Sequence, residues 1–142
     1  MNRHELLTEL NKDNFEFFHI GQDECHVRLD DDLEIMVQLS GGSISKKRMD
    51  LLKKILENYE KDIAKAVQQL KSFDLDIGDS YFLYGIFVGE FNFGSHGRHL
   101  FDRFTVSLKR KDGTIQDELN LGIYTVQFKA DGWPLGVSLW FE

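Results

Sequence analysis

The densest group of chemically competent side chains lies within residues 89–103, whose sequence is GEFNFGSHGRHLFDR. Within it, His96, His99 and Asp102 follow the spacing H-x-x-H-x-x-D. Histidine together with carboxylate is a ligand set that zinc and iron use, and imidazole also suits acid–base catalysis because it titrates near neutral pH. With Glu90 close by, the segment raises one functional hypothesis: a small enzyme or metal-binding protein with its site around these four residues.

The glycines of the same segment argue against that hypothesis. Two histidines three positions apart face the same way only on a helix, whereas Gly94, Ser95 and Gly97 favour a loop. The chain also lacks the glycine-rich frames that bind nucleotides and the G-x-S-x-G turn of serine hydrolases. The sequence therefore predicts no catalytic residue, no metal site and no cofactor, with the metal set His96, His99 and Asp102 kept as the alternative.

A second group of functional candidates is acidic and occupies two N-terminal turns. Its layout lacks the alternating ligands, central glycine and bidentate glutamate of a helix–loop–helix calcium site. One interpretation is that these acids are turn residues only, and the other is that they dock another protein with a basic surface. Four aromatic residues, Phe91, Phe93, Trp133 and Trp140, are candidates for partial exposure, and Trp140 either closes a second layer or offers a binding anchor. The predicted partner-binding residues are Asp23, Glu24, Asp30, Asp31, Asp32 and Trp140.

The overall charge limits the kind of partner. The chain of 142 residues has 17 basic and 24 acidic side chains, a net charge of −7, which disfavours nucleic acid because phosphate contacts need clustered Lys and Arg. Residues 1–34 contain ten acids and three bases, whereas residues 46–71 contain eight bases and four acids. These two regions either complement each other within the fold or serve different partners.

Composition also bounds the location and the number of domains. No apolar run approaches the roughly 18 residues of a membrane span, and the start MNRHELLTEL does not read as a signal peptide. The length fits one domain, 1–142. We therefore expect a cytoplasmic protein without a membrane partner, and Cys25, the single cysteine, excludes an internal disulfide.

Hydrophobic periodicity predicts a short helix at residues 3–10 and β-strands at 15–20, 25–29 and 33–39, followed by one long helix. In that helix, at about 45–72, apolar residues recur every three or four positions, and its length of roughly 40 Å leaves room for a break near Glu60–Asp62. Further strands are expected at 80–93, 101–109, 114–121, 123–129 and 135–141.

These elements predict an α+β fold. The N-terminal strands and a C-terminal meander would form an antiparallel sheet, because consecutive strands joined by short turns usually pair. The long amphipathic helix would pack on one face of that sheet, since its apolar stripe needs a surface to cover it.

The C-terminal stretch YTVQFKADGWPLGVSLWFE contains the motif W-x-x-G-V, which begins at Trp133. This stretch resembles small uncharacterised bacterial α+β proteins. Some of those proteins are immunity proteins of toxin systems, and the resemblance implies a protein partner without carrying over any catalytic residue. The leading hypothesis is therefore a non-enzymatic protein-binding module, such as an immunity protein that neutralises a toxin. A homo-oligomeric scaffold that uses exposed aromatic residues is a further hypothesis.

Overall fold

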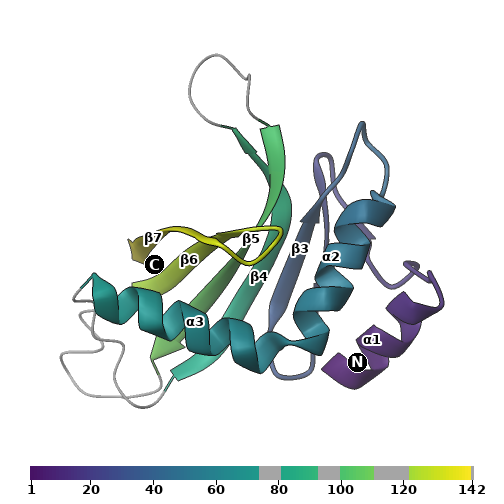
Figure 1. Cartoon of the computed structure of the whole chain (residues 1–142). Coiled ribbons are helices and arrows are strands. Elements are labelled where there is room, and N and C mark those ends of the chain that lie inside the picture. The colour runs from purple at the N-terminus through teal and green to yellow at the C-terminus, as the bar shows by residue number, and fades with distance from the viewer. Residues whose placement is uncertain (74–80, 93–99, 111–121, 142) are drawn as a thin grey trace.

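Seven strands form one mixed sheet, and three helices pack on one of its faces (Figure 1). The computed structural model describes residues 1–73, 81–92, 100–110 and 122–141. The described elements are α1 (Arg3–Asn11), β1 (His19–Ile20), β2 (Glu24–Arg28), β3 (Glu34–Gln38), α2 (Lys46–Glu57), α3 (Tyr59–Ser72), β4 (Tyr81–Asn92), β5 (Leu100–Arg110), β6 (Gly122–Lys129) and β7 (Pro134–Phe141).

The strands follow one another across the sheet in chain order, from β1 to β7. The α+β class is confirmed, but the prediction of a purely antiparallel sheet is wrong at one junction, because β3 and β4 are parallel, with Ile35 beside Ile86. Every other neighbouring pair in the described sheet is antiparallel. The cause is the helical connection: α2 and α3 return the chain to the starting end of β3, which a tight turn could not do.

The prediction of a single long helix at about 45–72 is also wrong. The chain leaves helical geometry at Asn58, with φ −124° and ψ 23°, and the Asn58 side-chain amide donates to the Lys54 carbonyl oxygen at 3.1 Å. Before Asn58, α2 packs against β3 and β4. After it, α3 takes a different direction and packs against β5, β6 and β7 (Figure 1). A twisted sheet rotates from strand to strand, so one straight helix could not follow all of it.

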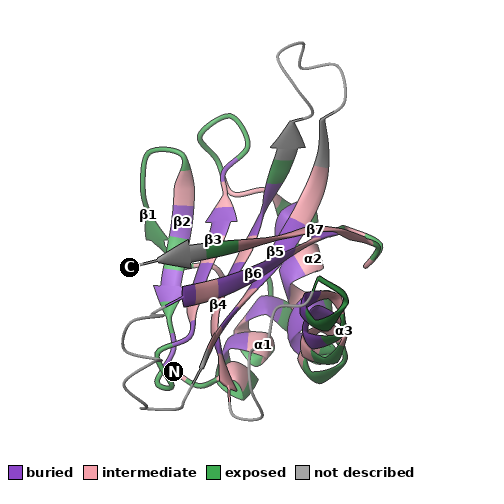
Figure 2. Ribbon diagram, turned by 90° about the vertical axis from the view of Figure 1, so that its left-hand side faces the viewer, coloured by how far each residue is buried: buried purple, intermediate pink, exposed green. Residues whose placement is uncertain are grey.

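The hydrophobic core lies between the sheet and the helices (Figure 2). Alternate residues of β2 and β3 point into it, as the period-2 pattern predicts. Phe104 and Phe128 stack there with ring centroids 5.0 Å apart. Cys25 is fully buried, and burial raises the pKa of its thiol. Other fully or nearly fully buried side chains are Leu6, Leu10, Leu33, Ile35, Val37, Met49, Leu52, Leu70, Val88, Leu108 and Val126.

Several smaller predictions have clear outcomes. The first helix is present, and Asn2 and Glu5 form its reciprocal capping box. The strand expected at 15–20 shrinks to His19–Ile20, while the strand expected at 114–121 lies outside the described residues. No helix in the described part of the chain is long and apolar enough to cross a membrane.

The helix packing makes a stability prediction. Leu52 is fully buried beneath α2, so Leu52→Ala should lower the free energy of unfolding by about 2–5 kcal/mol, the usual cost of a core cavity. Glu57 lies on the exposed side of the same helix, and Glu57→Ala should change stability by less than about 0.5 kcal/mol. Urea denaturation of both variants measures the difference, and equal losses would mean that the buried face of α2 is assigned wrongly.

Candidate functional site

The structure brings two of the four candidate chemical residues together. Glu90 on β4 and Asp102 on β5 are direct partners in the antiparallel ladder. His96 and His99 lie outside the described residues. Across the part of the chain that is described, no cluster of three or more metal-ligating side chains occurs.

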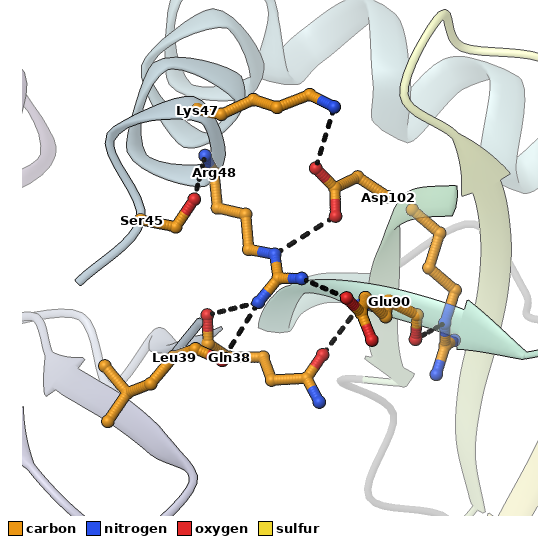
Figure 3. A network of polar contacts seen from close by, with 8 residues as sticks. Gln38, Leu39, Ser45, Lys47, Arg48, Glu90 and Asp102 are labelled. Atoms are coloured by element: carbon orange, nitrogen blue, oxygen red, sulfur yellow. Dashed lines mark hydrogen bonds and ion pairs between the residues drawn. The ribbon is translucent and has the colours of Figure 1, made fainter. Parts of the chain in front are cut away.

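The two carboxylates converge on a buried arginine that the sequence analysis did not single out (Figure 3). Arg48, in the first turn of α2, is only 4% exposed. Its Nε donates to Oδ1 of Asp102 at 3.0 Å, and its Nη2 lies 3.0 Å from Oε1 of Glu90. Its Nη1 donates to the carbonyl oxygens of Gln38 and Leu39, each at 3.0 Å.

The first role of this arrangement is to neutralise a buried charge within the fold. An arginine side chain stays protonated in proteins, and a buried cation is tolerated only where hydrogen bonds and opposite charges surround it. Glu90 and Asp102 supply that charge, so both are held in ion pairs with Arg48. The network joins the start of α2 to the end of β3 and to the β4–β5 pair.

The sequence does contain a signal that Arg48 is buried. The buried residues of α2 include Leu52, Ile55 and Leu56, which lie four, seven and eight positions after Arg48, and this spacing puts Arg48 on the apolar face of the helix. A charged residue on that face requires buried partners. The sequence gives no direct indication, however, that the partners are carbonyl groups at the end of β3.

A close approach of strands supports the network from beneath. The backbone N–H of Glu90 donates to Oε1 of Gln38 at 2.7 Å. A Cβ atom at the preceding residue, Gly89, would lie 2.7 Å from that same oxygen and 2.7 Å from the ring of Phe87. A side chain there would push aside the ends of the Gln38 and Phe87 side chains, so glycine permits this close packing.

The five predicted acids fall into two separate places. Asp23 and Glu24 lie at one end of β2, and Asp30 and its neighbours at the other, so the strand separates them by roughly 17 Å. Asp30 accepts a hydrogen bond from the Met1 amino group at 2.7 Å, and Asp31 pairs with Arg3 at 3.1 Å.

Local pairing therefore accounts for two of the five acids. Asp32 is exposed with a positive φ of 64°, a conformation that aspartate adopts in turns. The acids do not form a single surface patch.

The predicted aromatic anchor, Trp140, has a side chain outside the described ones, whereas Trp133 is an exposed tryptophan among the described side chains. Trp133 is 69% exposed and follows the turn between β6 and β7. Its backbone N–H donates to Oδ1 of Asp131 at 3.0 Å, and Gly132 completes the turn at φ 92°. The indole is thus carried on a turn whose backbone is held in place.

A pocket of about 240 Å³ lies where α2 meets α3, lined in part by the same β6–β7 turn. Its lining is partly apolar, but three lysines from the two helices border it. Burial raises the pKa of the Asp62 carboxyl in this pocket, and the neighbouring lysines oppose that shift only in part. The lining residues are Leu51, Lys54, Ile55, Asn58, Lys61, Asp62, Lys65, Phe104, Ala130, Asp131 and Gly132.

The position of the pocket shows where part of the basic region of the sequence lies. Residues 46–71, which contain eight bases, form most of α2 and α3, and three of their lysines line the pocket together with Asp131 and Gly132 rather than facing the acidic turns. Of the bases in this region, Lys46 pairs with Asp13 of the N-terminal region at 3.5 Å. Complementarity between the two regions is therefore real but partial.

Comparison of the chain with protein-family models, with curated proteins and with solved structures finds no match. The comparisons thus leave the resemblance to bacterial α+β immunity proteins as a prediction. The function must be argued from the geometry of this molecule.

The arginine network predicts a large asymmetry between two adjacent basic residues. Arg48→Met should lower the free energy of unfolding by about 3–5 kcal/mol, because it leaves Asp102 and two carbonyl groups buried without their donor. Lys47, which is 84% exposed and lies 3.6 Å from the same aspartate, is the matched control. Lys47→Met should cost less than about 0.5 kcal/mol in urea denaturation, and a comparable loss from both variants would show that the buried network is not a major source of stability.

The pocket predicts a pH-dependent gain in stability from Asp62→Asn. Because burial places the pKa of folded Asp62 above its ordinary value of 3.8, the folded state binds this proton more tightly than the unfolded state does. Wild-type stability at this site therefore falls as the pH rises through that folded pKa. Asp62→Asn should be more stable than wild type at pH 7, with the difference shrinking as the pH falls toward 4. Unfolding curves at several pH values measure this, and a variant less stable at pH 7 would contradict it.

Proposed function

We propose that the protein is a non-enzymatic protein-binding module whose main contact surface is Trp133 and the adjoining pocket. The proposal rests on one observation: Trp133 is 69% exposed and follows a fixed turn whose residues Asp131 and Gly132 line a pocket of about 240 Å³. Tryptophan is enriched among the few interface residues that contribute most binding energy, particularly where a pocket accompanies it. A monomer gains nothing in stability from exposing so large an apolar side chain.

The chemistry of the pocket indicates what a partner presents to it. Leu51, Ile55 and Phe104 supply apolar surface, and Lys54, Lys61 and Lys65 supply positive charge around it. A partner segment that combines an apolar side chain with a carboxylate complements both features.

The acidic turns provide a second, weaker contribution. Asp23 and Asp32 are exposed, and Glu24 is partly exposed; among the described residues, none of the three appears in an ion pair closer than 4 Å. Their charge would speed the approach of a partner with a basic region, an effect that salt screens. They are proposed as contributors to the association rate, whereas Trp133 is proposed to set the lifetime of the complex.

Within this proposal, the more specific function is that of a bacterial immunity protein that neutralises a toxin. The resemblance of the C-terminal stretch to such proteins supports it, together with the acidic balance and a surface that can occlude a partner. The alternative, an enzyme or metal site around Glu90, His96, His99 and Asp102, is less favoured because Arg48 already holds both carboxylates in ion pairs.

The experiment is a quantitative binding comparison of two exposed aromatic residues. A partner is captured on immobilised wild-type protein from a lysate of the source cells, identified by mass spectrometry and prepared pure. Trp133→Ala should then weaken the measured Kd at least about tenfold, mainly through faster dissociation. Phe73, which is 57% exposed at the end of α3, is the control, and Phe73→Ala should change Kd less than about threefold.

Two results would contradict the proposal. One is equal affinity of wild type and Trp133→Ala for a saturable partner, which would move the interface elsewhere. The other is a stoichiometric metal or a catalysed reaction of the purified protein that depends on His96 or His99. For the immunity role, expression of the purified partner's gene in a bacterial host should be toxic, and co-expression of the wild-type chain should restore growth.

A further inference from the structure

Two histidines face each other across the first two strands of the sheet. His19 on β1 and His26 on β2 are direct partners in the antiparallel ladder. Their rings are tilted by 31° to each other, with centroids 5.4 Å apart, and both residues are exposed. Neither belongs to the Arg48 network or to the surface around Trp133, so the pair calls for an explanation of its own.

The pair lies on the face of the sheet opposite the helices. On β2, Cys25 and Val27 are buried in the core beneath the helices, so His26 between them points the other way. His19 shares the face of its ladder partner. Figure 2 shows β1, which carries His19, as exposed.

The short strand that carries His19 is fixed on both sides. Before it, Phe18 is only 5% exposed and anchors the chain in the core. After it, the backbone N–H of Gly21 donates to the carbonyl oxygen of Glu24 at 2.7 Å and closes the turn into β2. The position of His19 relative to His26 is therefore set in advance, which is what a pair of ligands requires.

The separation of the rings matches that of two imidazoles on one metal ion. A bond from a first-row metal ion to an imidazole nitrogen is about 2.0–2.1 Å long, and that nitrogen lies roughly 1.1 Å from the ring centroid, so each centroid lies about 3.2 Å from the ion. At the angles of tetrahedral and trigonal coordination, two such centroids are about 5.2–5.5 Å apart. The observed 5.4 Å falls within this range, so a common ion needs no movement of the backbone.

The next residue in the same row across the sheet is a methionine. Met36 on β3 is the ladder partner of His26 on its other side. It lies between the buried residues Ile35 and Val37, so it shares the outer face with both histidines. Cross-strand partners have Cβ atoms about 4.5–5.5 Å apart, a distance that the long, flexible thioether side chain spans. Thioether sulfur selects Cu⁺, and imidazole suits copper as well.

The surrounding charges admit a cation. A hollow of about 450 Å³ borders the two histidines, and Arg28 and Met1 also line it. Arg28 lies 3.0 Å from Glu34, and the Met1 amino group lies 2.7 Å from Asp30, so both positive charges are paired. The chain as a whole has a net charge of −7, which attracts cations to its surface.

We propose that His19, His26 and Met36 form a binding site for Cu⁺. No third imidazole, thiolate or carboxylate joins the two histidines among the described side chains, so the thioether completes the ligand set. The site lies on an exposed strand pair, which leaves the bound ion open to exchange with other molecules. It is independent of the partner-binding surface at Trp133, and the failure of either proposal leaves the other unaffected.

Competition with a coloured chelator measures the site. The full chain is titrated with Cu⁺ in the presence of bicinchoninate, without oxygen and with a reductant. Wild type should take up one Cu⁺ per chain. His26→Phe should weaken Cu⁺ binding at least about tenfold, since the loss even of an outer-shell partner costs metal sites about ten- to a hundredfold. Phenylalanine keeps an aromatic ring of high β-propensity at this position, so the pairing of β1 with β2 is retained.

Two further variants separate the proposed ligands from other groups. Met36→Leu conserves volume and should also weaken Cu⁺ binding at least about tenfold. His4 is the matched control, because it is an exposed histidine on α1, outside the pair. His4→Ala should leave the affinity unchanged, and circular dichroism establishes that each variant is folded.

X-ray absorption at the copper edge identifies the ligands directly. Wild type should show two imidazole nitrogens and one sulfur, and Met36→Leu should lose the sulfur. Absence of one-to-one uptake, or uptake that His26→Phe leaves unchanged, overturns the site. A sulfur signal that persists in Met36→Leu would assign the sulfur to Cys25 and overturn it as well, as would tighter binding of Zn²⁺ than of Cu⁺.

Discussion

The buried guanidinium of Arg48 is the interaction on which the arrangement of helices and strands depends. A charge that cannot be lost must be neutralised where it is buried, and its partners come from the end of β3 and from β4 and β5. These contacts fix the first turn of α2 against the sheet at the parallel junction. Since β3 and β4 meet there without a hairpin to hold them in register, this network substitutes for a turn.

The direction of the chain after this point follows from the same constraint. With its first turn held at β3 and β4, α2 cannot also cover the later strands of a twisted sheet, so the helix ends at Asn58 and α3 takes a new direction. The bend leaves a pocket between the helices and the β6–β7 turn. The proposed binding surface is thus a consequence of how the helical connection crosses the sheet, because α2, α3 and the turn that carries Trp133 all contribute to it.

Local patterns predicted most elements but not the contacts between distant ones. The alternation in residues 33–39 and the helical period in 46–72 depend on neighbours in sequence, and both yield the buried residues observed, such as Ile35 and Leu52. The parallel β3–β4 pair, by contrast, depends on residues about fifty positions apart, and periodicity carries no information on strand direction. In the candidate site, the sequence offers Glu90 and Asp102 as parts of an alternative enzyme or metal site, whereas the structure places both in ion pairs with Arg48, a residue more than forty positions away in sequence.

The distribution of charge bears on how a partner would approach the molecule. Acids of the N-terminal region lie on turns, and bases of residues 46–71 lie on helices that border the pocket, so these two groups of opposite charge occupy different surfaces of the described fold. Salt screens attraction at either surface, whereas it does not screen apolar contact at Trp133. Under the proposed function, raising the salt concentration should therefore slow association with a charged partner while leaving the dissociation rate little changed.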